Sequence, residues 1–566
     1  MTVVPITLDA KPETLLHQVR WLLEHCADHR SVTVISGEAE RSYSVGEFFH
    51  HAARYAHALD AIGASPGELV VLILPQEENA LFGFWGAMLL GAVPSMFAYL
   101  TDKLDPIRYY DSVRKLVQHA NARFVITDTA LFDPLSAALD GLAVVISADT
   151  LQPGGDPAEY LARPLPQTDS IAFLQHSSGS TGLQKGVMLS HRAVINQLAS
   201  YGQAIELAPD DVIVSWLPLY HDMGLIAAFI QPIMQAIHLV LMSPTAWVRA
   251  PQILLQAITR HRGSLVWLPN FAYNFLATRI RDSALDGIDL SSLRAVINCS
   301  EPVYAESHRV FTARFAPFAL RESALMTCYA MAENTFAVTS SQMNKIPRID
   351  RVDRRRLAEE RIAYQTDGDA FEVVSCGTSI IGCQVRIVDA ERQTLPERSI
   401  GEIALQSDSM LSGYHNQAEI TAAALVDGWY FTGDMGYLAD GELYITGRKK
   451  DLIIVGGKNI YPQDIENLLN DIPGIHPGRI VAFGVDNTDL GTQDIGILAE
   501  VDDPADLEGE GRAVIVRTIR SRIAQSTDVS ARYVDLVPLR WLIKTSSGKI
   551  ARAANRDKYF EAQKSP

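Results

Sequence analysis

The sequence predicts an α/β fold in two parts, a large N-terminal domain with layered mixed sheets and a small α+β C-terminal domain. The chain has 566 residues, beyond the length at which a single hydrophobic core stops growing. Short apolar runs alternate with longer helical patterns from about Asp9 to Ile445, a rhythm typical of domains with mainly parallel sheets. Near Gly447 this rhythm gives way to the basic cluster "TGRKKD", which indicates a domain boundary.

An uncharged run from Ala80 to Leu100, "ALFGFWGAMLLGAVPSMFAYL", follows the strand-like segment "ELVVLIL". The run is just long enough to span a bilayer. Pro94 interrupts it, however, so we interpret it as a buried helix that ends near Gly91 and a short strand after it. We therefore expect a soluble protein with no membrane insertion.

The segment Gln175–His191, "QHSSGSTGLQKGVMLSH", places a polar, glycine-rich run between two apolar runs. It is not a Walker loop, because the strand-like segment "GVMLS" follows where a Walker loop enters a helix. We expect a strand-loop-strand hairpin that binds phosphate through backbone N–H groups, hydroxyls and one lysine. Its residues are Ser177, Ser178, Gly179, Ser180, Thr181, Gly182 and Lys185. The alternative is a polar surface turn.

The C-terminal part begins with a strand, a glycine pair and a helix opened by Pro462. Two further strands, "GRIVAFGV" and "DIGILAEV", precede a long helix around Arg512 to Ala524 and the tail "LIKTSSGKIARAANRDKY". About 115 residues are a plausible size for an independent domain.

Charge and cysteine content exclude several classes of protein. The formal net charge of -17 has the wrong sign for a protein that binds nucleic acid through its phosphates. No secretory signal is visible at the N-terminus. The cysteines are odd in number and are not spaced as paired zinc ligands, which fits the reduced cytoplasm, and we interpret all five as core residues. They are Cys26, Cys299, Cys328, Cys376 and Cys383.

Seven short motifs follow one another along the chain. They are "SSGSTGLQKGV", "SWLPLYHDMGL", "INCSEPV", "CYAMAENT", "YFTGD", "TGRKKD" and "KTSSGK". In this order they resemble the adenylate-forming superfamily, which includes acyl-CoA synthetases, peptide-synthetase adenylation domains and luciferases. The resemblance covers essentially the whole chain. It implies that a carboxylic acid attacks the α-phosphate of ATP, with Mg²⁺ as cofactor, to give an acyl adenylate and pyrophosphate, and that a thiol then displaces AMP.

The resemblance assigns the chemistry of the first step to three places. The glycine-rich loop would hold the β- and γ-phosphates, and Thr181 and Glu333 would position Mg²⁺, a hard ion that prefers oxygen ligands. Lys549 would bridge the carboxylate and α-phosphate oxygens. Without the resemblance, Glu333 reads as a surface helix carboxylate and Lys549 as a solvated lysine of the tail.

The nucleotide site implied by the resemblance has an adenine pocket and a ribose clamp. Tyr329, between Cys328 and Ala330, would stack on adenine, opposite a wall made of Ser300, Glu301 and Pro302. Asp434 and Arg448 would bind the ribose hydroxyls. A buried core tyrosine is the alternative for Tyr329.

The resemblance also implies domain rotation between the two steps. The N-terminal domain would span residues 1–446, the hinge 447–451 with Lys450 at its pivot, and the small mobile domain 452–566. Rotation would remove Lys549 and bring up Gly456 and Gly457, which leave room for a phosphopantetheine arm. His221 would be the gate between the acyl and thiol channels, although a lone histidine can equally be a core residue.

Several stretches resemble the fatty acyl-AMP ligases within this superfamily, including "GGKNIYPQDIENLL" and the long spacer between Glu333 and Cys376. In that branch such an insertion is associated with poor use of free CoA and transfer to an acyl carrier protein. No "GxDSL"-type pantetheine attachment site occurs in the chain, so we expect a separate carrier. Four insertion arginines could meet an acidic carrier; they are Arg351, Arg354, Arg355 and Arg356.

The acid is expected to be apolar. The segment "WLPNFAYNFLA" matches a stretch that lines the acyl tunnel in the family, and the residues assigned to the acyl pocket are Met223, Gly224, Phe229, Asn270, Phe271 and Tyr273. The sequence therefore predicts a fatty acyl-AMP ligase that acts on a trans-acting carrier. The phosphate loop is closer to the general superfamily pattern, so an acyl-CoA ligase is the main alternative. A non-catalytic nucleotide-binding homologue and a luciferase-type oxygenase are the others.

Overall fold

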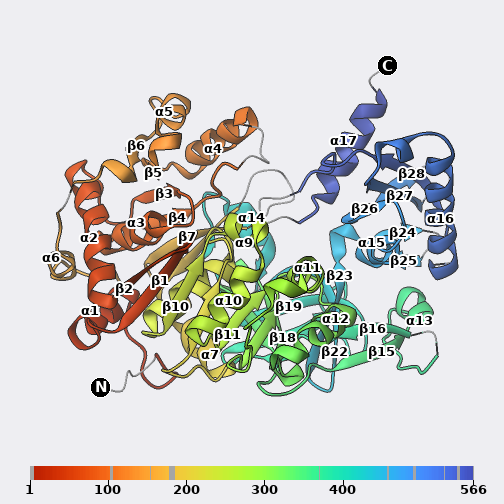
Figure 1. Ribbon diagram of the computed structural model, residues 1–566, viewed down its shortest axis with the longest axis horizontal. Helices are drawn as coiled ribbons and strands as arrows, with labels where there is room; N and C mark the ends of the chain where they lie inside the picture. Colours follow the sequence, from red (N-terminus) through yellow and green to blue (C-terminus); the bar gives the residue numbers. More distant parts are fainter. Residues whose placement is uncertain are drawn as a thin grey trace. The chain divides into compact units, whose positions relative to one another are not determined.

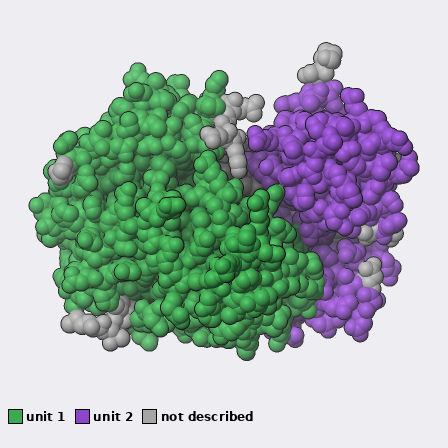
Figure 2. All heavy atoms as spheres, viewed as in Figure 1, with its two compact units in different colours: residues 1–349, 374–385, 405–430 green, residues 350–373, 386–404, 431–566 purple. Residues whose placement is uncertain are grey.

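The computed structural model describes residues 6–101, 106–152, 154–177, 185–368, 370–455, 458–487, 492–527, 529–544 and 549–564. Thr181 and the rest of the loop 178–184, together with Gly456 and Gly457, lie outside the described residues, as does the side chain of Ser177. The chain divides into two compact units (Figure 2). Unit 1 contains residues 1–349, 374–385 and 405–430, and unit 2 contains 350–373, 386–404 and 431–566.

A seven-stranded sheet in unit 1 carries the predicted hairpin. Its order is β20-β8-β7-β4-β3-β5-β6, with β3 Leu69–Ile73, β4 Val93–Met96, β5 Phe124–Thr127, β6 Val144–Ser147, β7 Ile171–Ser177, β8 Lys185–Ser190 and β20 Gly413–Tyr414. The strands β3 to β7 pair in parallel, whereas β8 pairs antiparallel with β7, and Ser177 stands opposite Lys185. The predicted strand-loop-strand hairpin is therefore confirmed.

A nine-stranded sheet forms the second layer of unit 1, in the order β17-β14-β13-β12-β11-β9-β10-β1-β2. Its inner strands pair in parallel, and antiparallel strands stand at both edges. The bounds are β1 Arg30–Ser36, β2 Ala39–Ser44, β9 Val212–Ser215, β10 His238–Met242, β11 Leu265–Leu268, β12 Ala295–Asn298, β13 Leu325–Ala330, β14 Ala337–Ser340 and β17 Thr378–Ser379. The sheets are mixed, as the sequence predicts.

The uncharged run 80–100 folds as expected for a core element. Helix α3 (Glu78–Leu89) is followed by β4, and Phe84 and Trp85 on α3 are fully buried. α3 packs beside α2 (Val45–Ala61), as Figure 1 shows. A Cβ atom at Gly86 would lie 2.4 Å from the carbonyl oxygen of Ala52 on α2, so glycine permits this close approach. Across the described part of the chain, we find no helix with the length and apolar character needed to cross a membrane.

Helices connect the strands of both sheets of unit 1. They are α1 Leu15–His25, α4 Pro106–Ala120, α5 Thr129–Ala138, α6 Pro157–Leu161, α7 His191–Ala204, α8 Gln231–Met234, α9 Pro244–Arg249, α10 Gln252–His261, α11 Asn270–Arg279, α12 Ala305–Phe315 and α14 Ala418–Ala424. Serine and aspartate caps explain several helix starts: Ser44 forms a capping box with Glu47 at α2, and Ser190 caps α7.

Unit 2 contains the predicted C-terminal α+β fold. Its sheet has the order β26-β27-β28, with β26 Ile475–Asn487, β27 Thr492–Val501 and β28 Ala531–Val537. The helices α15 (Pro462–Leu469) and α17 (Arg552–Lys564) contact β26, and α16 (Gly509–Thr527) contacts β28 (Figure 1). A separate pair of short strands, β24 Ile453–Val455 and β25 Lys458–Ile460, precedes α15.

The long spacer after Glu333 folds as β15 (Ile349–Asp353), α13 (Arg354–Glu359) and β16 (Ala370–Val374). Val352 and Leu357 from this insertion share one hydrophobic cluster with Tyr437, Tyr444 and Tyr461. Unit 2 thus contains residues from both sides of the hinge predicted at 447–451. The hinge at 447–451 is a prediction about rotation of the small domain between the two steps, and it stays a prediction.

Five strands contain the sequence positions at which the chain passes from one unit to the other. They are β15 and β16 of the insertion, β18 Cys383–Val388, β19 Gly401–Ser407 and β22 Trp429–Ala439. β22 continues into β23 (Glu442–Arg448) as an antiparallel hairpin. This hairpin positions two of the predicted nucleotide-binding residues.

Candidate active site

Glu333 lies in a tight turn between β13 and β14 of unit 1. The turn is a single 3₁₀ segment, Ala332–Asn334, followed by Thr335 with φ 62° and ψ -54°. Phe336 N–H donates to the carbonyl oxygen of Asn334 at 2.6 Å, so Thr335 is the centre of a γ-turn of the rare, strained kind. The side chain of Thr335 is fully buried and donates to the carbonyl oxygen of Ser409 at 2.7 Å. Strain held by surrounding contacts is common at functional sites.

The carboxylate of Glu333 is partly buried and has an aromatic partner. Tyr414 Oη donates to Glu333 Oε1 at 2.9 Å, and Tyr430 Oη lies 3.0 Å from Tyr414 Oη. Burial raises the pKa of Glu333, and the charge of Asp222 adds to this rise. A hydrogen bond from its own backbone N–H, the hydrogen bond from Tyr414 and the charge of Lys185 oppose it. A bound cation would stabilise such a carboxylate.

The residues around Glu333 fit Mg²⁺. In the described ranges no three histidine, cysteine, aspartate or glutamate side chains gather closely enough to hold a metal. Mg²⁺ typically binds through one or two carboxylates together with substrate phosphates and water, so a single carboxylate is sufficient on the protein side. The other predicted ligand, Thr181, lies outside the described residues.

Lys185 brings the β7–β8 hairpin, predicted to bind phosphate, to the same tyrosine. It is the first residue of β8, and its Nζ lies 4.7 Å from the centre of the Tyr414 ring. A cation at this distance from an aromatic face is attracted by the ring. Glu333 and Lys185, predicted as metal ligand and phosphate-loop cation, therefore meet at Tyr414.

The two predicted walls of the adenine pocket lie at the same end of neighbouring strands. β12 and β13 are parallel with Asn298 opposite Thr327. Ser300, two residues after β12, therefore lies level with Tyr329, the second-last residue of β13. Tyr329 is 7% exposed, Cys328 beside it is buried, and Ala330 and Pro302 are more accessible. Ser300 has φ 70°, a left-handed conformation that costs a non-glycine residue free energy. Glu301 accepts a hydrogen bond from Phe271 N–H at 3.0 Å, so its side chain caps α11.

His221 precedes η2 (Met223–Ile230), a helix of the wide π type. Its Nδ1 lies 2.6 Å from Asp222 Oδ1, and its side chain is 23% exposed. The core histidine His191 of unit 1 is, by contrast, only 2% exposed. Asp222 also accepts a hydrogen bond from Met223 N–H at 2.8 Å, which fixes the start of η2. π-type turns are frequent at functional sites.

The residues predicted for the acyl pocket fall into two groups. Phe271 is 42% exposed and stands edge-on to a stacked pair, Trp216 and Trp247, whose ring centres lie 3.7 Å apart. Met223 Sδ lies 3.9 Å from Ser300 Oγ, and a Cβ atom on Gly224 would lie 2.2 Å from the Pro218 carbonyl oxygen. Met223 therefore lies beside the predicted adenine wall, and position 224 requires glycine.

The other three predicted pocket residues make structural contacts in the core. Tyr273 is fully buried and donates to the carbonyl oxygen of Val296 at 3.0 Å. Asn270 donates to Ser307 Oγ at 3.1 Å and accepts from Asn298 at 3.1 Å. Phe229 is fully buried and packs edge-on against aromatic residues of α3, Phe84 and Trp85.

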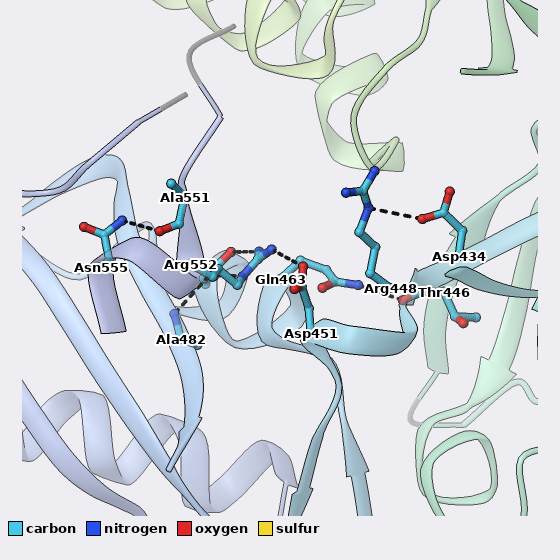
Figure 3. A network of polar contacts seen from close by, with 10 residues as sticks. Asp434, Thr446, Arg448, Asp451, Gln463, Ala482, Ala551, Arg552 and Asn555 are labelled. Atoms are coloured by element: carbon cyan, nitrogen blue, oxygen red, sulfur yellow. Dashed lines mark hydrogen bonds and ion pairs between the residues drawn. The ribbon is translucent and has the colours of Figure 1, made fainter. Parts of the chain in front are cut away.

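In unit 2, Asp434 and Arg448 face each other across the β22–β23 ladder. Arg448 Nε donates to Asp434 Oδ1 at 3.1 Å, as Figure 3 shows. The Asp434 side chain is 14% exposed and that of Arg448 50% exposed. A carboxylate and a guanidinium held side by side suit the recognition of adjacent hydroxyl groups. The predicted pivot, Lys450, follows in the short turn Lys449–Asp451.

The described residues on either side of 545–548 are bound to α17. Lys544 and Ile550, the residue after Lys549, form an isolated β-bridge. Asn555 is fully buried; it accepts from Ile543 N–H at 2.7 Å and donates to the carbonyl oxygens of Ile543 at 2.8 Å and Ala551 at 3.0 Å. Lys549 itself is partly exposed.

Arg552, three residues after Lys549, extends this fastening within unit 2. It donates to both carboxylate oxygens of Glu466 on α15 at 3.0 and 2.6 Å. It also donates to Asp451 at 3.1 Å, as Figure 3 shows. The bidentate pair is a strong, directional contact. The segment that bears Lys549 is thereby tied to the turn that contains Lys450.

Sequence reasoning did not find three of the residues that organise this site. Tyr414 and Asp222 stand within recognisable segments, "LSGYHN" and "LYHDMG", but their roles depend on contacts that no spacing reveals. Trp247 lies in "SPTAWVRAPQ". The sequence shows that it is aromatic, but only the structure shows that it stacks on Trp216.

Comparisons with known proteins agree with this geometry. A family model described as AMP-binding enzyme matches residues 22–415. The medium-chain-fatty-acid acyl-carrier-protein ligase JamA of Moorena producens (strain JHB) is 32% identical, over 87% of this chain and 86% of its own length. A Caulobacter vibrioides (strain NA1000 / CB15N) protein with the provisional name acyl-CoA synthetase is 30% identical, over 93% of this chain and 92% of its own.

A solved structure from work on fatty acyl-adenylate ligases of E. coli and L. pneumophila superposes with a TM-score of 0.88 at 28% identity, covering 98% of both chains. The predicted α/β fold and the resemblance to adenylate-forming enzymes are thereby confirmed. Since the family model spans well over half of the 566 residues, the chain belongs to the family of AMP-binding enzymes.

Proposed function

We propose that this chain is a fatty acyl-AMP ligase: it converts an apolar carboxylic acid and ATP to an acyl adenylate and pyrophosphate, then transfers the acyl group to a separate acyl carrier protein. The observation that carries the proposal is the meeting of Glu333 and Lys185 on Tyr414, next to the phosphate hairpin. The similarity of this chain to JamA supports a fatty acid as substrate and a carrier protein as acceptor. Its similarity to the solved fatty acyl-adenylate ligases supports the fatty acid.

In the first step a carboxylate oxygen of the acid attacks the α-phosphorus. The bond to the bridging oxygen breaks, and pyrophosphate leaves with the electron pair. Lys185 and the loop 178–184 would hold the leaving group, while Lys549 would orient the acid and stabilise charge on the α-phosphate. Mg²⁺, held by Glu333 and Thr181, would supply charge stabilisation at the phosphates.

In the second step the phosphopantetheine sulfur attacks the acyl carbonyl carbon. The bond to AMP breaks, AMP leaves as the phosphate anion, and the thiol proton passes to solvent or phosphate. His221, which is partly exposed and has its Nδ1 2.6 Å from Asp222 Oδ1, would control the access of the thiol. Gly456 and Gly457 would leave space for the phosphopantetheine arm.

The packing of the insertion supports a carrier protein as acceptor. Val352, Leu357 and Val373 share a hydrophobic cluster with Tyr461, and Leu452 packs against it. Both Leu452 and Tyr461 follow Lys450 in the chain, so rotation about Lys450 would have to separate buried apolar surface. Loss of such contacts costs about 25 cal/mol per Å², and an acceptor that contributes its own binding energy can offset this cost. We place the reaction in the cytoplasm, where the buried, unpaired cysteines stay reduced.

The decisive experiment supplies ATP, Mg²⁺ and a medium-chain fatty acid to the purified protein, with free CoA and holo-carrier in parallel, and identifies the products by mass spectrometry. We expect acyl adenylate in both reactions, and acyl thioester only in the reaction that contains the holo-carrier. Efficient acyl-CoA formation would favour the acyl-CoA ligase alternative, which the Caulobacter relative supports. Absence of acyl adenylate with a panel of acids would refute the proposal.

Charge reversal on the insertion tests whether it contacts the carrier. Arg354 lies 5.2 Å from the Phe371 ring and Arg356 4.1 Å from the Tyr364 ring, whereas Arg351 and Arg355 are exposed. We therefore expect Arg351→Glu with Arg355→Glu to raise the carrier KM roughly 5- to 10-fold, because complementary charge steers association. The adenylation rate should stay unchanged. Arg281→Glu, another exposed arginine, is the control, and unchanged carrier kinetics would refute the contact.

A further inference from the structure

We infer that Tyr414 is a positioning residue that sets the carboxylate of Glu333 relative to Lys185 of the phosphate hairpin, an inference that rests on the proposed function. The hydroxyl and the ring of Tyr414 serve two different partners. The hydroxyl binds Glu333, and the ring face binds Lys185. Both partners are predicted to contact the polyphosphate of ATP: Glu333 through a bound metal ion, and Lys185 directly.

The hydrogen bonds around Tyr414 have a fixed direction. A carboxylate can only accept, so the Tyr414 hydroxyl donates its proton to Glu333 Oε1. The Tyr430 hydroxyl, 3.0 Å away, must then be the donor to Tyr414. This hydrogen bond restricts the rotation of the Glu333 carboxylate, so that its remaining lone pairs keep a defined direction for a bound cation.

The backbone of Tyr414 is fixed as firmly as its side chain. It pairs with Val187 of β8, two residues from Lys185, and its N–H donates to Thr421 Oγ1 at 2.9 Å. The side chain is 3% exposed. Tyr414 can therefore hold Lys185 through both the β-ladder and the ring face.

The segment that precedes Tyr414 holds the other partner. Leu411 N–H donates to the Glu333 carbonyl oxygen at 2.9 Å, and Ser409 accepts from the buried Thr335 hydroxyl. Residues 409–414 thus contact the Glu333 turn at three points, two through the backbone and one through the Tyr414 hydroxyl. Only the last contact reaches the carboxylate, and it is the one that can set the orientation of a metal ligand.

The test compares Tyr414→Phe, which removes the hydroxyl and keeps the ring, with Tyr430→Phe, which leaves the Tyr414–Glu333 bond in place. Binding of Mn²⁺ in the presence of α,β-methylene-ATP is followed by electron paramagnetic resonance. We expect Tyr414→Phe to raise the half-saturating Mn²⁺ concentration roughly 5- to 20-fold, the effect of losing a hydrogen bond to a charged ligand. Tyr430→Phe should change it by less than about 2-fold.

ATP–pyrophosphate exchange provides a second readout. Tyr414→Phe should need more Mg²⁺ for half-maximal exchange and should recover most of the rate at saturating Mg²⁺, a pattern that a general loss of stability does not produce. Unchanged Mn²⁺ and Mg²⁺ dependence in a variant with the wild-type melting temperature would overturn the inference.

Glu333→Asp tests the same contact without changing Tyr414, because the shorter side chain keeps the charge but withdraws it from the hydroxyl. Wild-type Mn²⁺ binding in Glu333→Asp would also overturn the inference, even if Tyr414→Phe failed to fold. Wild-type protein that binds Mn²⁺ with the analogue but forms no acyl adenylate would instead overturn the proposed function and leave this inference standing.

Discussion

Replacing Lys549 with alanine is expected to slow acyl-adenylate formation by roughly 10³-fold, because one positive charge would be lost from the oxygens that gain charge in the transition state. Transfer from a supplied acyl adenylate to the carrier should survive, since the second step does not use this lysine. ATP–pyrophosphate exchange measures the first half-reaction, and thioester formation from synthetic acyl adenylate measures the second.

Lys544→Ala is the matched control for this variant. Lys544 pairs with Ile550, the residue after Lys549, and its Nζ lies 3.4 Å from the Gly478 carbonyl oxygen. It should retain both half-reactions. Equal losses in the two half-reactions of Lys549→Ala would refute the role proposed for Lys549. A lower melting temperature would indicate that the contacts of Asn555 and Arg552 near Lys549 are disrupted.

Glu333→Gln is expected to reduce adenylation about 100-fold at subsaturating Mg²⁺, because the amide keeps the size of the side chain and can accept from Tyr414 but lacks the charge that a divalent cation needs. The measurement is the exchange rate as a function of Mg²⁺ concentration. Glu306→Gln, which removes an exposed carboxylate 3.2 Å from Arg309, should leave the rate unchanged.

Stability provides an independent check on Glu333→Gln. Burial raises the pKa of Glu333, so its ionised form costs free energy in the folded state, and this cost grows as the pH rises through the folded-state pKa. Without Mg²⁺ at neutral pH, Glu333→Gln should therefore melt no lower than the wild type. A marked drop in melting temperature would mean that Glu333 is a structural carboxylate.

Patterns of local sequence predicted those parts of the fold that depend on local rules. The polar run between two apolar runs correctly indicated the β7–β8 hairpin. The uncharged run interrupted by Pro94 folds, as predicted, as a helix and then a short strand: α3 ends at Leu89, and Pro94 lies within β4. The motifs also placed Asp434 and Arg448 as partners, because an antiparallel hairpin brings the ends of its strands together.

Contacts between distant segments could not be predicted in the same way. Tyr414 and Glu333 are 81 positions apart, and no periodicity connects them. The segment Trp267–Ala277 was recognised by its motif, yet the motif does not say which side chains point into the core, as Tyr273 and Asn270 do. The insertion was visible as extra length, whereas its packing with Tyr461 depends on the tertiary structure.

Ser300 and Thr335 show how the geometry of this site is maintained. Each non-glycine residue with such dihedral angles costs on the order of 1–3 kcal/mol, a large fraction of the net stability of a domain. Glycine would relieve this strain at either position. The chain instead keeps side chains that contact Met223 and Ser409. Ser300 and Thr335 therefore lower the stability of the fold while they keep the geometry of the site rigid. Selection for heat resistance alone would therefore work against the very features that shape the proposed nucleotide site.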